Sequence, residues 1–189
     1  MKWTIPILMH AATLVVGCAV TGTREADRYF VLEATPAPAA APHSNAAVRV
    51  EPASASSFYD TQDIVYSRAP GTRAYYQFNH WTERPQRAIH PQLASRLRAD
   101  APKSVLVLKT HLDEIYHDAA VAPGTARITI TVELVESASR MVLARRTFTH
   151  AAPAASYDAP GAVQGFNQAL GGVLDDIVSW VDAQAPTPK

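Results

Sequence analysis

The sequence predicts an α+β fold: a single domain in which two helices pack on a mostly antiparallel sheet. Three observations predict it. The 189 residues suit one domain better than two. Hydrophobic residues make up 48% of the chain, which is enough for a buried core. Along the chain, the patterns run strands, helix, strands, helix, an order typical of helices packed on one antiparallel sheet.

The first 17 residues predict a secretory signal peptide. Lys2 is followed by an apolar stretch that is too short to span a bilayer, which takes about 20 apolar residues. The stretch ends in VVGC at residues 15–18, where a small residue directly precedes the only cysteine of the chain. This ending resembles the bacterial lipobox, so we expect diacylglycerol on the Cys18 thiol. The alternative is an ordinary signal peptide with an incidental cysteine.

Lipidation at Cys18 would anchor the protein to a membrane. Each buried CH₂ contributes about 0.8 kcal/mol, so two or three acyl chains hold far more firmly than one. Ala19 follows the cysteine, and by analogy with enteric bacteria the lack of Asp there favours the periplasmic side of the outer membrane over the inner membrane. Residues 18–26 form a short polar segment, which predicts a tether.

The domain itself is expected over residues 27–184, and its first half holds four short strands. The turn signal Pro70-Gly71 joins the last two in a hairpin. An Ala/Pro-rich loop, residues 34–47, follows the first strand. The β-prone runs place the strands at residues 29–32, 48–50, 63–67 and 74–78.

A helix over about residues 85–99 follows. Ile89, Leu93 and Leu97 recur at helical spacing and form one apolar stripe. Pro91 interrupts this pattern, and one interpretation places the first turn of the helix there.

The second half begins with a long strand over residues 104–116, whose apolar first half indicates cover on both faces. Residues 125–136 alternate strictly between apolar and polar, and residues 141–148 complete an antiparallel hairpin with them. After a loop at residues 151–160, a helix over about residues 161–183 carries a continuous apolar stripe, and residues 185–189 form a tail. The stripe consists of Val163, Phe166, Leu170, Val173, Leu174, Ile177 and Val181.

Motifs for catalysis or cofactor binding are missing from the sequence. It contains no nucleophile elbow, phosphate-binding glycine loop or zinc-protease motif. His111 and His117 fall on one strand about 20 Å apart, too far to share a metal, so we interpret them as surface or loop histidines. The net charge of +0 does not favour a nucleic-acid partner. We therefore expect no enzyme activity and no cofactor other than the acyl chains on Cys18.

Aromatic residues are densest around residues 75–81. Core packing with a loop anchor is one interpretation of this cluster. The other is contact with a partner or an acyl chain, because Tyr and Trp are enriched in binding surfaces. On the second interpretation the partner-binding residues are Tyr75, Tyr76 and Trp81.

Together these motifs resemble the ABC-type transport auxiliary lipoprotein family over nearly the whole mature chain. The resemblance starts at the lipobox Cys18 and includes the opening YFVL and the closing helix. The matching segments are residues 29–32, 64–66, 75–76, Trp81, Pro85, Leu93, Leu97, 143–148 and 169–180. The Ala/Pro-rich insert at 34–47 and the alanine-rich loop at 151–160 depart from the family pattern.

The resemblance implies a function in lipid traffic across the bacterial envelope. Such lipoproteins work with an inner-membrane ABC transporter and with MCE-domain proteins that form a conduit, and some assemble into rings, so a homo-oligomer is implied too. We expect a non-enzymatic adaptor in an intermembrane lipid transport system. The alternatives are a periplasmic lipid carrier with its own apolar cavity and an envelope enzyme or assembly factor of another kind.

Overall fold

The structure is a computed structural model that describes residues 25–35, 48–97 and 106–184. The predicted signal peptide, Cys18, the tail, and most of the tether and of the Ala/Pro-rich loop lie outside the described residues. Within the described segments, no helix is both long enough and apolar enough to cross a membrane.

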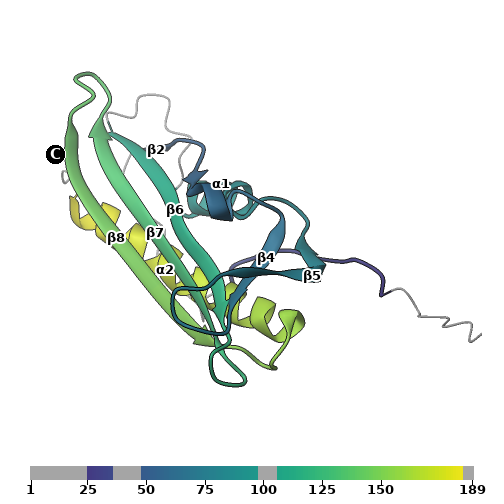
Figure 1. Ribbon diagram of the computed structural model, residues 1–189. Coiled ribbons are helices and arrows are strands. Elements are labelled where there is room, and N and C mark those ends of the chain that lie inside the picture. The colour runs from purple at the N-terminus through teal and green to yellow at the C-terminus, as the bar shows by residue number, and fades with distance from the viewer. Residues whose placement is uncertain (1–24, 36–47, 98–105, 185–189) are drawn as a thin grey trace, which may run out of the picture.

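One sheet of eight strands forms the framework, in the spatial order β1-β5-β4-β6-β7-β8, with β2 and β3 also paired to β6. Two helices and a short 3-10 turn complete the described part of the fold, which confirms the predicted α+β class (Figure 1). The strands are β1 (Arg28–Phe30), β2 (Val48–Val50), β3 (Ser54–Ala55), β4 (Asp63–Ser67), β5 (Ala74–Trp81), β6 (Leu106–Asp118), β7 (Thr125–Glu136) and β8 (Val142–Pro153). The helices are α1 (Pro85–Arg96) and α2 (Ala159–Gln184), and the 3-10 turn is η1 (Ser57–Tyr59).

Strand β6 organises the sheet, because three short strands share one of its edges. From its beginning to its end, β6 pairs in parallel with β2 at Leu106, with β3 at His111 and with β4 at His117. Its other edge pairs along its full length with β7, and β7 pairs with β8, both antiparallel. The long antiparallel ladders dominate, as predicted.

The two faces of the β6–β7–β8 ladder differ in chemistry. Apolar residues meet on one face, where Leu108 lies opposite Leu134 and Ile130 lies opposite Phe148. Polar residues occupy the other, where Thr131 lies opposite Thr147 and Glu133 opposite Arg145. We call this polar side the open face, because the described helices contact the opposite side. The alternation of β7 sets this division, since neighbouring strand residues point to opposite faces.

Helix α2 covers the apolar face of the long strands (Figure 1). All seven residues of the predicted stripe are buried, among them Phe166, Leu170 and Leu174 at 0% exposure. Burying a side chain of this size contributes about 1.5–3 kcal/mol, so the stripe fixes α2 on the sheet.

Residues 31–35, which we call the strap, run between α1 and α2. Gln92 of α1 accepts a hydrogen bond from the Ala34 N–H (2.8 Å) and donates one to the Leu32 carbonyl (3.0 Å). On the other side, Asn167 of α2 accepts from the Glu33 N–H (3.1 Å). Leu32 is 2% exposed, so the strap belongs to the core.

Several elements differ from the sequence expectation. Helix α1 begins at Pro85 and contains Pro91, which therefore does not mark its first turn. Strand β8 continues to Pro153, through the beginning of the predicted loop at 151–160. The beginning of β6, by contrast, is buried on both faces as its apolar pattern indicates, with Leu108 at 0% exposure on the helix-covered face and Val107 at 3% on the open face.

Candidate functional site

The predicted lipidation site, Cys18, lies outside the described residues, and its modification stays a prediction. Strand β1 begins at Arg28, so the segment from Cys18 reaches at most about 35 Å when fully extended. Lipidation at Cys18 would hold the domain within that distance of a membrane.

The three aromatic residues predicted to bind a partner do not share one surface, although all belong to β5. Trp81 is 1% exposed and packs edge-on against Phe166 of α2, with ring centroids 5.5 Å apart. This placement argues against a partner contact at Trp81, because the side chain is enclosed by the core. Tyr75 and Tyr76 are neighbours on the strand and point to opposite faces of the sheet.

Tyr75 is the member of this set that solvent reaches best, at 42% exposure. It stacks on Phe58, with ring centroids 4.9 Å apart, and Phe58 is 39% exposed. Nearby on the open face, the Arg73 guanidinium lies 3.7 Å from the centre of the Tyr116 ring. Partner binding at Tyr75 stays a prediction that this exposed aromatic pair can support.

Tyr76 points to the helix-covered side, where it meets His117. The sequence interpretation of His117 as a surface or loop histidine is wrong, because the side chain is 0% exposed. Its Nε2 lies 2.9 Å from the Pro123 carbonyl oxygen, and its Nδ1 lies 2.8 Å from the Tyr76 hydroxyl. A carbonyl can only accept, so Nε2 carries the hydrogen and Nδ1 accepts from Tyr76. In the neutral ring, these two contacts therefore select the tautomer with its hydrogen on Nε2.

Burial also shifts the acid–base behaviour of this pair. Loss of contact with water lowers the pKa of His117, and the hydrogen bond to Pro123 opposes this only in part. Burial raises the pKa of Tyr76 to about 12. Both groups stay neutral near pH 7, which suits a structural link between β5 and the end of β6.

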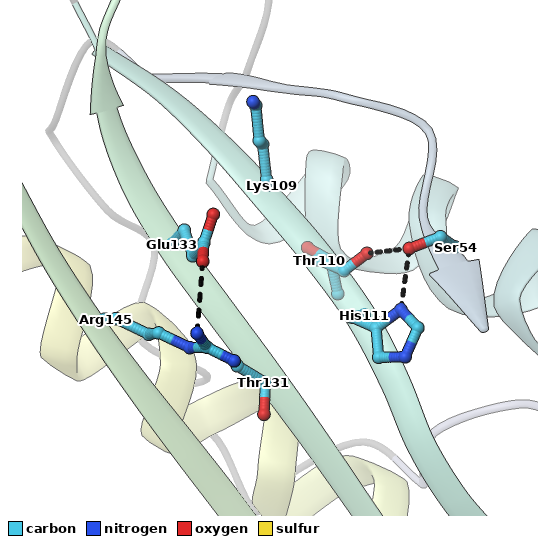
Figure 2. A pocket seen from close by; sticks show the side chains of 7 residues that line it. All are labelled: Ser54, Lys109, Thr110, His111, Thr131, Glu133 and Arg145. Atoms are coloured by element: carbon cyan, nitrogen blue, oxygen red, sulfur yellow. Dashed lines mark hydrogen bonds and ion pairs between the residues drawn. The ribbon is translucent and has the colours of Figure 1, made fainter. Parts of the chain in front are cut away.

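A polar hollow of about 260 Å³ lies on the open face over β6, β7 and β8 (Figure 2). Arg145 approaches Glu133 at 3.6 Å, and Figure 2 shows Lys109 pointing away from both. The lining residues are Ser54, Lys109, Thr110, His111, Thr131, Glu133 and Arg145. Motif searches missed this group because its members come from separate strands.

Ser54 and His111 in this hollow form a hydroxyl–imidazole pair. Two of the three members of a nucleophilic triad form such a pair. The Ser54 hydroxyl lies 2.8 Å from Nδ1 of His111. The other ring nitrogen contacts the Ser56 hydroxyl at 3.2 Å, where a triad requires a carboxylate. Asp113, on the same strand, accepts a hydrogen bond from Thr131 instead. The arrangement therefore lacks the third member that activates a serine.

Metal binding finds no support in the described segments. They contain no group of three or more His, Cys, Asp or Glu residues placed to hold an ion.

Comparison with known proteins assigns the family. The family model described as "ABC-type transport auxiliary lipoprotein component" matches residues 30–178, which is more than half of the chain. The chain belongs to this family. The match confirms the resemblance seen in the sequence and identifies the domain as an auxiliary lipoprotein component of ABC-type transport. None of the curated proteins gives a significant match.

Solved structures share the fold of this chain. Protein XCC0632 from Xanthomonas campestris is 25% identical, with a TM-score of 0.70 over 83% of this chain and 97% of that chain. A second crystal structure, of an uncharacterized protein, is 13% identical, with a TM-score of 0.60 over 85% of this chain and 99% of that one. The second likeness concerns the fold alone.

Proposed function

We propose that the protein is a lipid-anchored, non-enzymatic adaptor in an ABC- and MCE-type intermembrane lipid transport system. The family match over residues 30–178 carries the proposal, since that family is described as an auxiliary lipoprotein component of ABC-type transport. The lipobox ending at Cys18 supplies the anchor. The inner-membrane ABC transporter and an MCE-domain conduit protein are the proposed partners.

The design of the domain supports an adaptor. One face of the sheet is filled by α2, α1 and the strap, and the open face is polar. A lipid carrier would need an enclosed apolar cavity for acyl chains. The described residues instead show surface hollows of about 260–350 Å³ whose linings include Lys109, Arg145 and Arg49. The charged linings of these hollows favour the adaptor over the carrier.

In the proposed mechanism, the anchor places the domain where the conduit can bind it. Acyl chains on Cys18 hold the domain at the periplasmic side of the outer membrane, where Ala19 after the cysteine favours sorting. The domain then presents its exposed surfaces to the conduit, which docks against the anchored protein. No chemical step is required of the domain.

In-cell crosslinking tests the proposal. The full-length protein, a Cys18→Ala variant and a Thr21→Ala control from the same tether would be expressed in a Gram-negative host and crosslinked. We expect the wild type and Thr21→Ala to fractionate with the outer membrane and to bring down an MCE-domain protein or the permease. Cys18→Ala should lose both behaviours. Soluble protein in all three cases, with no transport component recovered, would contradict the proposal.

A further inference from the structure

Strand β8 is an open edge of the sheet, because its one partner among the described strands is β7. The Ala154 N–H donates to the Gly124 carbonyl (3.0 Å), which continues the β7–β8 ladder past its end. Hydrogen-bonded pairs alternate in an antiparallel ladder, so the backbone groups of Arg145, Thr147 and Thr149 point away from β7. These unpaired N–H and C=O groups are the template that an added strand requires.

Apolar side chains gather at the beginning of this edge. Met141 is 58% exposed, and Val142 and Leu143 are each 49% exposed. Leu143 lies where the register between β7 and β8 shifts. Three consecutive exposed apolar residues beside an unpaired backbone form a surface that a partner can bury.

The same segment carries positive charge without compensation inside the strand. Arg145 and Arg146 belong to β8, Arg140 precedes it, and β8 contains no Asp or Glu. Arg145 contacts Glu133 at 3.6 Å but remains 67% exposed, and Arg146 lies over the Phe148 ring at 5.0 Å. An occupant of this edge that carries carboxylates is therefore favoured over a neutral or basic one.

We propose that the open edge of β8 binds an extended, acidic segment of a partner protein, which adds a strand beside residues 142–149. Its backbone pairs with the outward groups of β8, its carboxylates meet Arg145 and Arg146, and apolar side chains cover Met141–Leu143. The arginines also discourage edge pairing with neutral strands, so they select for an acidic one.

The charge of β8 argues against a second copy of the chain as the occupant of this edge. A second β8 would bring its own Arg145, Arg146 and His150 and no carboxylate. Like charges on facing strands destabilise pairing.

The position of this edge in the fold argues against a membrane surface as its occupant. The hairpin end near Met141 lies beside Leu106, at the beginning of β6, whereas β4 joins β6 at His117. The 13 residues of β6 span about 40 Å, and the chain from Cys18 enters on the β5 side through β1. The apolar end of the edge therefore lies far from the point where the anchored chain enters the domain (Figure 1).

Photo-crosslinking in cells tests the edge. A photoreactive phenylalanine replaces Leu143 in the full-length protein, and a control places it at Val121, which is 77% exposed in the β6–β7 loop. We expect position 143 to crosslink a protein whose attached peptide, mapped by mass spectrometry, is extended in sequence pattern and rich in Asp or Glu. Position 121 should not capture that peptide.

Two variants at Thr147 then distinguish the effect of a lost backbone hydrogen bond on the crosslink from the effect of a lost side chain. Thr147→Pro removes one outward N–H, and Thr147→Ala keeps it; both lose the same hydroxyl contact to Thr131. We expect Thr147→Pro to lower the 143 crosslink about tenfold relative to Thr147→Ala, with equal thermal stability. Arg145→Glu combined with Arg146→Glu should also abolish it, and Arg127→Glu on β7 should not.

Each other outcome overturns the inference. These outcomes are crosslinks to a second copy of the chain, crosslinks to lipid, a signal at 143 no higher than at 121, or equal crosslinking in the two Thr147 variants. If the protein with an unchanged Thr147 brings down the transport components while position 143 gives no crosslink to an acidic peptide, the edge proposal fails and the adaptor function stands.

Discussion

Acidification should lower the free energy of unfolding through His117, because this histidine is buried. The pKa of this buried histidine is lowered from its ordinary value of 6.5. Between the folded pKa and 6.5 the unfolded chain binds a proton that the folded chain does not, so stability falls as pH falls through that window. Above 6.5 the full stability is present, and below the folded pKa the loss levels off.

The size of the loss follows from linkage. A single group changes the free energy of unfolding by up to about 1.4 kcal/mol per pH unit, and each unit of pKa lowering costs about 1.4 kcal/mol once complete. That is a large share of the about 5–15 kcal/mol typical of a domain. The structural reason is burial, because water does not reach the protonated ring to stabilise its charge.

Urea unfolding of the wild type and a His117→Gln variant at pH 7.5, 6.5, 5.5 and 5.0 measures this contribution. All other ionisable groups are common to the two proteins, so the difference in their free energies of unfolding isolates His117. We expect the difference to shrink as the pH falls below 6.5. A difference that stays constant from pH 7.5 to 5.0, or a His117 ring that protonates at pH 6.5 or above by NMR, would refute the reasoning.

Three further substitutions test the core. Trp81→Ala should lower the free energy of unfolding by about 3–5 kcal/mol, because the side chain is 1% exposed; a cost below 1 kcal/mol in urea unfolding would place Trp81 at the surface. Gly124→Ala should lower the melting temperature, because φ is +91° and an added Cβ would lie 2.1 Å from Nε2 of His117; an unchanged value in calorimetry would contradict that packing. Gln92→Ala removes both hydrogen bonds to the strap, so limited proteolysis should cleave residues 31–35 faster than in the wild type, and equal rates would show that these bonds do not hold it.

Local patterns were sufficient to predict several elements. Strands at 48–50, 63–67 and 125–136 have the predicted bounds, because alternation and turn residues mark their ends. The stripe of α2 was also visible, since its helical spacing continues from Val163 to Val181, about five turns, without a break. In these cases the residues that decide the structure are neighbours in sequence.

Elements that depend on distant partners were not predictable in this way. Strand β3 has two residues and exists because Ser54 and Ala55 pair with His111 and Leu112 of β6. Strand β5 extends to Trp81 because β1 pairs with its last three residues. The extension of β8 through an Ala/Pro sequence follows from pairing with the start of β7, which overrides weak β-propensity.

The candidate site shows the same division. The sequence indicated Cys18 and an aromatic cluster, yet it could not tell that Tyr75 is exposed while Trp81 is enclosed by Phe166. The open edge of β8 carries no motif. It is recognisable only once the strand order is known, because an edge is a property of the whole sheet.

The shared edge of β6 has a consequence for the order of folding. β2 and β3 find their partner in β6, which begins at Leu106, so a chain made from its N-terminus has no template for them until that strand exists. The β6–β7–β8 meander and α2, by contrast, are joined by short connections and can assemble locally. We therefore expect pulse-labelled hydrogen exchange during refolding to protect β7 amides before those of β2, and the reverse order would contradict this. On this expectation, the C-terminal half is the nucleus onto which the earlier part of the chain condenses.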